Sequence, residues 1–349
     1  MELWKAMELD DTEQLVLCQD KGSGLKAIIA IHNTRLGPAL GGCRIWDYTS
    51  EEEAIRDALR LAKGMTYKCA VSGLPYGGGK AVIMGKPDPA RREAVFRSLG
   101  RFIETMQGRY ITGIDLGTTV QDMDAVRHET GYVTDTTGSL CATGEFTAEM
   151  TAYGVYLGIR VALKEVYGTD DLNRITVVVQ GLGKVGTFLC RYLNDAGARL
   201  IVADVDERRV LFAMKQFGAS AVMPDQIYAA ACDVFSPCAL GGILNDTTLG
   251  QLRCRIVAGA ANNQLAEPRH GVLLNGAGIL YAPDYVINAG GIIVTAAELN
   301  GCNGAQAKQQ VERISANAAG VFQSARTEGI AASLAADRLA EQRLVNAAP

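Results

Sequence analysis

Histidine, tryptophan and paired cysteines are what this sequence has least of. Its 349 residues include 3 histidines and 2 tryptophans, and its 9 cysteines contain no C-x-x-C pair and no nearby histidine cluster. A structural zinc site needs Cys and His ligands at short spacings, so the sequence predicts no metal site. An odd number of scattered cysteines is typical of reduced, buried thiols, which predicts a cytoplasmic protein.

Long apolar runs and a strong excess of one charge are missing as well. No segment is long and charge-free enough to span a bilayer, and residues 1–19 have neither a basic start nor an apolar run, so we expect no signal peptide. A net charge of -4 with 21% charged residues describes an ordinary globular protein. Nothing in this balance attracts nucleic acid or an anionic membrane, so the expected partners are small-molecule substrates.

The length of the chain indicates two domains, because one hydrophobic core rarely grows to this size. In the first part, a capping box at Ser50 and Glu53 begins an amphipathic helix that should end near Lys68. The other elements expected there are a hairpin of strands 14–18 and 25–32, a glycine run at 77–80, a strand over 81–84, a helix over 89–106 and a strand over 109–112.

After the flexible stretch 138–144, short apolar strands alternate with helices, which predicts a parallel, doubly wound sheet. The strands are expected at 175–179, 200–203, 233–235, 256–258 and 278–281. Two final helices, 305–327 and 330–345, should pack back on the first domain. The predicted fold is α/β, with two domains: an N-terminal domain with a mostly parallel mixed sheet, 1–138 plus about 328–349, and a Rossmann-type doubly wound domain, 139–327.

The strongest motif is a G-x-G-x-x-G that follows a β-branched strand and opens a helix. Its glycines allow a tight turn, a close approach of the backbone to a pyrophosphate, and close packing of helix on strand. Asp204 ends the next strand, where a carboxylate accepts hydrogen bonds from ribose hydroxyls and repels a 2'-phosphate. The pattern predicts NAD as cofactor. Its expected contacts are Gln180, Gly181, Leu182, Gly183, Lys184, Val185, Gly186, Asp204 and Val205.

Catalytic groups have to come from lysine and aspartate, because histidine is scarce. Lys68 ends the amphipathic helix, Lys80 follows three glycines, and Asp115 lies in a loop after a strand. Because glycines have no side chain, they let a substrate or a backbone segment approach Lys80 closely. A phosphate loop is excluded, since Ala81 and a strand follow Lys80 instead of Ser or Thr and a helix.

The chain resembles the glutamate/leucine/phenylalanine/valine dehydrogenase family along nearly its whole length. The stretches that carry the resemblance are Gly37–Gly42, Leu61–Lys68, Gly77–Lys80, Thr112–Thr118, Gly181–Gly186, Pro237–Leu240, Ala258–Leu265 and Ala282–Gly291. The resemblance implies that Lys68 and Asn262 hold the substrate carboxylate, that Lys80 is the general base and that Asp115 shuttles a proton. It also implies a homo-oligomer, in which 1–138 plus about 328–349 form the substrate-binding and oligomerisation domain and 139–327 form the NAD-binding domain.

The resemblance extends to the pockets. It implies substrate contacts from Leu40, Gly41, Gly42, Met65, Gly113, Ile292 and Thr295, and nicotinamide contacts from Thr151, Cys238, Ala239, Ala260 and Asn262. Leu40 stands where glutamate-specific members carry lysine, which favours an apolar substrate side chain. Gly113 lacks a methyl group that leucine-type members tend to have, which would enlarge the pocket toward phenylalanine. The loop 141–150 departs from the usual family sequence.

The implied activity is NAD-dependent, reversible oxidative deamination of an apolar L-amino acid, phenylalanine or a leucine-like one, to its 2-oxo acid and ammonia. Lysine is a base at neutral pH only if its pKa falls, and burial beside a second cation such as Lys68 has that effect. Closure of a cleft between the domains would exclude water. Two alternatives stay open: an NAD-dependent hydroxy-acid dehydrogenase, and a non-catalytic NAD-binding regulatory protein.

Overall fold

The structure, a computed structural model, describes residues 2–347 and divides them into two compact units. Unit 1 comprises residues 2–144, 295–303 and 340–347, and unit 2 comprises residues 145–294 and 304–339. The expected division differs from this one in three respects. Residues 139–144 and 295–303 lie in unit 1, and residues 328–339 lie in unit 2.

Unit 1 contains a mixed six-stranded sheet in the order β1-β2-β5-β3-β6, with β4 paired to β5. The pairs β1·β2 and β2·β5 are antiparallel, and β5 pairs in parallel with β3 and β4. Its elements before residue 144 are α1 (Leu3–Asp10), β1 (Gln14–Asp20), β2 (Leu25–Asn33), β3 (Ala39–Leu40), β4 (Cys43–Trp46), α2 (Glu51–Ser72), β5 (Gly77–Met84), η1 (Pro89–Arg91), α3 (Arg92–Glu104), β6 (Tyr110–Ile111) and α4 (Val120–Arg127).

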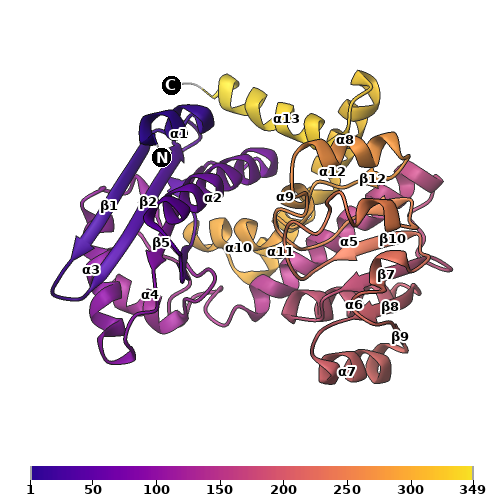
Figure 1. Cartoon of the computed structure of the whole chain (residues 1–349), viewed down its shortest axis with the longest axis horizontal. Helices are drawn as coiled ribbons and strands as arrows, with labels where there is room; N and C mark the ends of the chain where they lie inside the picture. The colour runs from indigo at the N-terminus through magenta and orange to yellow at the C-terminus, as the bar shows by residue number, and fades with distance from the viewer. Residues whose placement is uncertain (1, 348–349) are drawn as a thin grey trace. The chain divides into compact units, whose positions relative to one another are not determined.

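Helices cover both faces of this sheet. Successive side chains of the interior strand β2 point to opposite faces, and both sets are apolar. Ile29 and Ile31 of β2 pack in one core with Phe96 and Leu99 of α3. Ile28 and Ala30 pack in the other core, where α2 contributes Ala54, Ala58, Leu59 and Ala62. Figure 1 shows α2 lying along β2 and β5. The sheet is therefore a rigid, buried support for the residues at its strand ends.

Unit 2 is a doubly wound domain around an all-parallel sheet in the order β12-β11-β10-β7-β8-β9. Its elements are α5 (Glu145–Tyr167), β7 (Thr176–Gln180), α6 (Lys184–Asp195), β8 (Arg199–Ala203), α7 (Glu207–Phe217), β9 (Ser220–Ala221), η2 (Ile227–Ala229), β10 (Val234–Pro237), η3 (Leu249–Gln251), β11 (Ile256–Val257), α8 (Arg269–Gly276), β12 (Leu280–Tyr281), α9 (Asp284–Ile287), α11 (Gly304–Val311) and α12 (Arg313–Glu328). Two further helices, α10 (Gly290–Leu299) and α13 (Ala332–Asn346), have residues in both units. Strands β8 and β9 follow β7 on one side, and β10, β11 and β12 follow on the other side, so the order of the strands reverses between β7 and β10. Such a switch point is where this fold binds ligands.

Three expectations for the elements need correction. The helix expected to end near Lys68 continues to Ser72 and stops at Gly73, whose left-handed φ of 67° terminates it. The glycine run 77–80 belongs to the strand β5, because neighbouring backbones pair with it. The helix expected over 305–327 is two helices, of which α12 packs against α5 and α9 within unit 2.

The last helix partly meets the expectation that the C-terminal segment packs on the first domain. Arg343, near the end of α13, donates to the carbonyl oxygens of Ala70 and Val71 at 2.6 Å each. These carbonyls are at the C-terminus of α2, where a helix has unsatisfied acceptors and favours a cation. Among the described residues, no helix combines the length and the apolar character needed to cross a membrane.

Candidate active site and dinucleotide site

Glycines bring four backbone segments of unit 1 unusually close together. A Cβ at Gly41 would lie 1.9 Å from the carbonyl oxygen of Gly79, and a Cβ at Gly42 would lie 2.5 Å from that of Ile114. A Cβ at Gly78 would lie 2.1 Å from the backbone nitrogen of Thr66. The glycines before Lys80 therefore allow β3 and α2 to pack closely against β5. The groups that approach these glycines are mainly backbone atoms of the protein.

This packing places Lys80 and Asp115 side by side. Lys80 Nζ lies 2.9 Å from Asp115 Oδ2, and the lysine is only 5% exposed. Burial alone would raise the pKa of Asp115, but the positive charges of Lys80 and Arg44 outweigh it and lower the pKa to about 2. The two residues predicted to be catalytic thus form an ion pair between strand β5 and the loop after β6, in which Lys80 is buried and the side chain of Asp115 is 27% exposed.

Arg44 is a third member of this cluster, and sequence reasoning missed it. Its Nε donates to the same Oδ2 atom of Asp115 at 3.0 Å, and its Nη1 donates to Asp57 on α2 at 3.2 Å. Tyr48 also donates to Asp57, at 2.7 Å. One signal could have identified it: Arg44 lies in β4, only two residues beyond Gly42, where a stretch of family resemblance ends.

We expect Arg44→Gln to destabilise the protein by about 1–3 kcal/mol near pH 7, because Asp115 loses a charge-assisted hydrogen bond. Asp115 has a lowered pKa in the fold, so its ion pairs stabilise the protein above the usual value of 3.8, and this stabilisation is lost as the pH falls toward about 2. Urea unfolding at a series of pH values measures the difference from the unmodified protein, which should shrink as the pH falls below 4. An equal loss at every pH would assign Arg44 a packing role only.

The other predicted substrate residues of unit 1 lie on three elements. Lys68 and Met65 are half-buried on α2, and Met65 Cγ would lie 3.2 Å from a Cβ at Gly41. Leu40 is 1% exposed in β3, between β5 and β6. Thr295 on α10 is half-buried, with its Oγ1 4.0 Å from Cys141 Sγ.

Gly113 requires a correction. A Cβ at this position would lie 2.4 Å from Asp135 Oδ2 and 2.5 Å from Thr134 Oγ1. The space that the missing methyl group leaves is therefore filled by side chains of the protein. The glycine gives no ground for a larger substrate pocket, and the inference toward phenylalanine that rested on it does not hold.

In unit 2 the glycine motif forms the turn between β7 and α6. Gly181 adopts a left-handed φ of 98°, and a Cβ at Gly186 would lie 2.0 Å from the carbonyl oxygen of Gly181, so both positions need glycine. A Cβ at Gly183, the N-cap of α6, would meet no atom within 4 Å. Gly183 thus presents open space in front of the positive end of a helix, which is the arrangement that accepts a phosphate.

Asp204 anchors this turn. Its Oδ2 accepts from the backbone nitrogen of Leu182 at 2.6 Å, and its Oδ1 accepts from that of Asp206 at 2.8 Å. Arg209 Nη1 lies 3.8 Å from the carboxylate, whose side chain is 6% exposed. A carboxylate has about four acceptor positions, so hydrogen bonds to a ribose remain compatible with these contacts. Val205, the next residue, is 91% exposed.

A cavity of about 320 Å³ lies in front of the glycine turn, lined by Glu145, Leu182, Gly183, Lys184, Thr187, Phe188 and Arg209. Two of its basic residues, Lys184 and Arg209, suit a pyrophosphate. Lys184 Nζ also lies 3.0 Å from a carboxylate oxygen of Glu145, the first residue of α5. This contact joins Glu145, which lies in the divergent stretch 141–150, to the glycine turn. The glycine cradle, the helix end and the basic lining fit a dinucleotide.

The residues predicted for the nicotinamide end follow the neighbouring strands. Cys238 donates its backbone N–H to Gln180 at 2.7 Å, and a Cβ at Gly181 would lie 2.7 Å from Ala239 Cβ. Ala260 and Asn262 are joined by a residue the prediction missed, Asn288, whose Nδ2 donates to Ala260 O at 3.1 Å and to Asn262 Oδ1 at 2.8 Å. Asn288 lies within the resembling stretch Ala282–Gly291, which was the signal that could have identified it.

Two further predicted residues lie near the start of α10. Thr151 on α5 donates its hydroxyl to Thr147 O at 2.8 Å, and its Oγ1 would lie 3.1 Å from a Cβ at Gly291. Ile292 follows Gly291 and is half-buried. Close packing at these glycines holds the first turns of α5 and α10 together.

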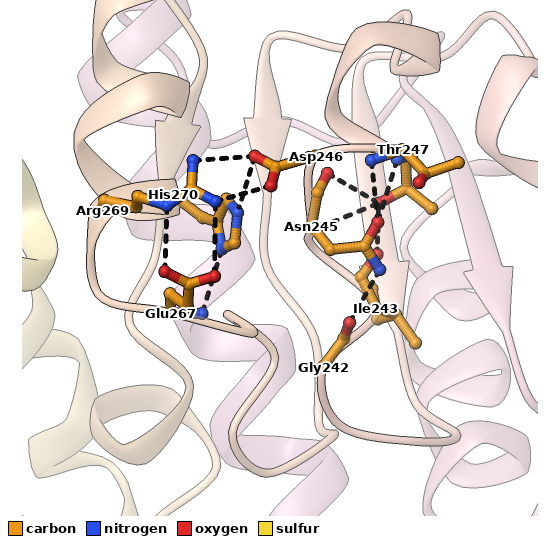
Figure 2. A network of polar contacts seen from close by, with 9 residues as sticks. Gly242, Ile243, Asn245, Asp246, Thr247, Glu267, Arg269 and His270 are labelled. Carbon is orange, nitrogen blue, oxygen red and sulfur yellow. Dashed lines mark hydrogen bonds and ion pairs between the residues drawn. The ribbon is translucent and has the colours of Figure 1, made fainter.

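Asp246, Glu267 and His270 form a cluster of possible metal ligands elsewhere in unit 2, and Figure 2 shows its contacts. Arg269 donates to both Asp246 and Glu267, so each carboxylate already has a cationic partner. His270 Nδ1 accepts from the backbone nitrogen of Glu267 at 3.0 Å, which leaves the ring proton on Nε2, 3.2 Å from Asp246. A protonated Nε2 cannot bind a metal, so the cluster is a salt-bridge network at the start of α8.

Two features define the class of protein. Unit 2 has a glycine cradle at the switch point of its sheet, and unit 1 has the Lys80–Asp115 pair; together they are typical of a nucleotide-dependent dehydrogenase. Comparison with known proteins narrows this class. Residues 13–132 match the Glu/Leu/Phe/Val dehydrogenase dimerisation domain, and residues 144–223 and 202–348 match the Glutamate/Leucine/Phenylalanine/Valine dehydrogenase domain. The chain belongs to this family. It is an amino acid dehydrogenase, and it carries out oxidative deamination of apolar amino acids.

Individual relatives match along nearly the whole chain. The leucine dehydrogenase of Geobacillus stearothermophilus is 54% identical over 344 residues, which are 99% of this chain and 94% of that protein. The phenylalanine dehydrogenase of Caldalkalibacillus thermarum is 43% identical over 342 residues, covering 97% and 92%. The crystal structure of L-tryptophan dehydrogenase from Nostoc punctiforme is similar with a TM-score of 0.87 at 42% identity, covering 99% of each chain. These relatives do not support the hydroxy-acid or the non-catalytic alternative.

Proposed function

We propose that this protein oxidises leucine and similar aliphatic L-amino acids with NAD, using Lys80 as general base and Asp115 as proton carrier. The observation that carries the proposal is the contact of 2.9 Å between the buried Lys80 and the half-buried Asp115. An exposed lysine would be a solvated charge, but Lys80 is 5% exposed and lies beside a proton acceptor. The 54% identity to a leucine dehydrogenase supports the substrate class.

The proposed reaction begins with the substrate carboxylate bound by Lys68 and Asn262. A dinucleotide held by the glycine turn and Asp204 would supply the hydride acceptor for the α-carbon. Asp115 first takes a proton from the substrate ammonium group, so that loss of the hydride leaves an iminium. Lys80, as the free amine, takes a proton from the water that attacks this iminium, and Asp115 returns its proton to the nitrogen. The C–N bond then breaks while the hydroxyl proton passes to the departing ammonia, which gives the 2-oxo acid and ammonium, and Lys80 afterwards releases its proton to solvent.

Proton movement within the Lys80–Asp115 pair makes this sequence possible. Asp115 stays ionised while Lys80 and Arg44 are both charged. If Lys80 passes its proton to Asp115, Lys80 loses the positive charge that helped to keep the Asp115 carboxyl group ionised. The transfer therefore leaves the total charge of the pair unchanged.

The aliphatic side-chain preference rests on two features of unit 1. Leu40 is 1% exposed at a position where a lysine would recognise a glutamate side chain. The space beside Gly113 is occupied by Asp135 and Thr134, which leaves no added room for an aromatic ring there. For the cofactor, Asp204 supports NAD over NADP, since a carboxylate repels a 2'-phosphate.

NADH formation with a panel of L-amino acids and both cofactors tests the proposal. We expect kcat/KM for leucine to exceed that for phenylalanine by about tenfold or more, the scale of one or two methylene groups. NAD should exceed NADP, and the reverse reaction should require ammonia. Higher kcat/KM with phenylalanine, tryptophan or glutamate, or with NADP, would contradict the corresponding part of the proposal.

We also propose that the protein is a cytoplasmic homo-oligomer that forms contacts through unit 1. Its residues 13–132 match a domain described as a dimerisation domain. Strand β1 lies at the edge of the sheet and carries Leu17, which is 64% exposed. None of the nine cysteines, all of which lie within the described residues, is in a disulfide, and this agrees with a reducing compartment. Light scattering on the purified protein tests the assembly, and a monomeric mass would exclude it.

A further inference from the structure

A buried carboxyl group lies behind the loop that presents Asp115. Asp135 is 8% exposed, and its backbone has a φ of 61°, a left-handed conformation that residues with a side chain seldom adopt. Its Oδ2 accepts a hydrogen bond of 2.6 Å from the backbone nitrogen of Ile114, the residue directly before Asp115. A buried charge in an unfavourable backbone conformation persists only where its surroundings hold it, which is a frequent feature of functional sites.

The surroundings hold Asp135 from two sides. Its backbone nitrogen donates to Glu298 Oε1 at 3.3 Å, and the other carboxylate oxygen of Glu298 accepts from Cys141 N at 2.8 Å. Its carboxylate occupies the place where a Cβ of residue 113 would be, 2.4 Å from that position. Gly113 and Asp135 are thus a matched pair: the glycine admits the carboxylate, and the carboxylate holds the next amide along the loop.

The electrostatic setting of Asp135 is the opposite of that of Asp115. The pKa of Asp135 is raised to about 6, chiefly by burial and also by the negative charge of Glu298, while the hydrogen bond from Ile114 opposes this shift. The titratable groups that face it are Glu298 on α10 and the thiol of Cys141, with Asp115 and its partners Lys80 and Arg44 beyond Ile114. Two neighbouring carboxyls therefore have pKa values of about 2 and about 6.

We propose that Asp135 is a positioning residue for the reaction: its carboxylate fixes the Ile114 amide, and so sets the geometry in which Asp115 contacts Lys80. This inference rests on the proposed function of Lys80 and Asp115. A carboxylate is a stronger acceptor than a neutral acid, so protonation of Asp135 weakens the bond to Ile114 and loosens the loop. Activity should then fall as the pH drops through the range in which Asp135 takes up a proton.

Asp135→Asn tests this role, because it keeps the shape and one acceptor oxygen but removes the charge. We expect kcat/KM for leucine to fall about 10- to 100-fold near pH 8, the scale of a small misplacement of a catalytic group. The unmodified protein should lose activity below a pH of about 6, and the variant should lack this limb. Asp124→Asn is the matched control, because Asp124 accepts from the backbone nitrogen of Thr137 at 2.8 Å without contacting Ile114, and it should keep the normal pH profile.

Thermal unfolding separates positioning from a merely structural role. A carboxyl whose pKa is raised in the fold stabilises it at low pH, and this stabilisation is lost as the pH rises through about 6. Asp135→Asn should therefore raise Tm near pH 8 and have little effect near pH 4. A variant that is more stable and yet slower, with a changed pH profile, is the expected result. A variant with unchanged kcat/KM at every pH would overturn the proposal.

The pair with Gly113 supplies a second test. Gly113→Ala should displace the Asp135 carboxylate from Ile114 and lower kcat/KM, while Gly113→Ala with Asp135→Gly should restore stability but not the acid limb. If the double variant regains both, Asp135 has no positioning role. Absence of leucine-dependent NADH formation in the unmodified protein would instead refute the proposed function, and so the two failures are distinguishable.

Discussion

Replacing Lys80 by alanine is expected to lower kcat for leucine deamination by about 10³-fold, within the range lost when a general base is removed. The reason is that Lys80 provides the buried amine 2.9 Å from Asp115, and water can reproduce neither its position nor its basicity. NADH binding should be unchanged, because the glycine turn belongs to unit 2 and Lys80 to unit 1. Steady-state kinetics and a fluorescence titration with NADH measure the two effects separately.

Lys86→Ala is the matched control for this variant. Lys86 lies two residues beyond the end of the same strand, β5, and is exposed, so its removal should leave kcat near that of the unmodified protein. Thermal unfolding shows whether Lys80→Ala still folds, since Asp115 keeps its hydrogen bond to Arg44. A folded Lys80→Ala protein with normal kcat would remove lysine 80 from the mechanism.

Gly183→Ala should weaken NADH binding by about 10- to 100-fold without changing stability. A Cβ at Gly183 would meet no protein atom within 4 Å, and the φ of -66° suits alanine. The added methyl group therefore disturbs only what approaches from outside, and in a dinucleotide site that is the pyrophosphate. Calorimetric or fluorescence titration measures the affinity, and thermal unfolding measures the stability.

Substitutions at two other glycines serve as controls for this result. Gly276→Ala, at the end of α8, also meets open space and should change neither affinity nor Tm by much. Gly186→Ala places a Cβ 2.0 Å from the carbonyl oxygen of Gly181, so it should destabilise unit 2 itself. Unchanged NADH affinity in Gly183→Ala would show that the open space at this turn is not where the dinucleotide binds.

Much of the fold follows from local sequence patterns. Strand β7, the turn at Gly181 and helix α6 appear where the motif predicts them, because the turn chemistry and the apolar strand are both local signals. The hairpin of β1 and β2 is predicted for the same reason. Predictions fail where tertiary contacts decide. The run 77–80 was predicted as a glycine run preceding a strand, and it is itself a strand because β3 and α2 pack against its backbone.

The candidate site shows the same division. Lys80 and Asp115 were found from residue type, spacing and family resemblance, but neither spacing nor resemblance revealed Arg44, 71 residues before Asp115. Gly113 was interpreted as space for substrate, whereas a side chain from 22 residues further along fills that space. Contacts between residues distant in sequence depend on how strands and loops pair, and no local pattern contains that information.

By itself the sequence determined the α/β class, the dinucleotide turn, the family and the two residues of the proposed acid–base pair. Each of these depends on short-range features: periodicity, glycine positions and residue types at fixed spacings. Only the tertiary structure decided which charges surround that pair, that Asp135 lies behind its loop, and that Gly113 makes room for it. The physical reason is that burial and charge set the behaviour of a carboxyl group, and both arise from segments that the fold alone brings together.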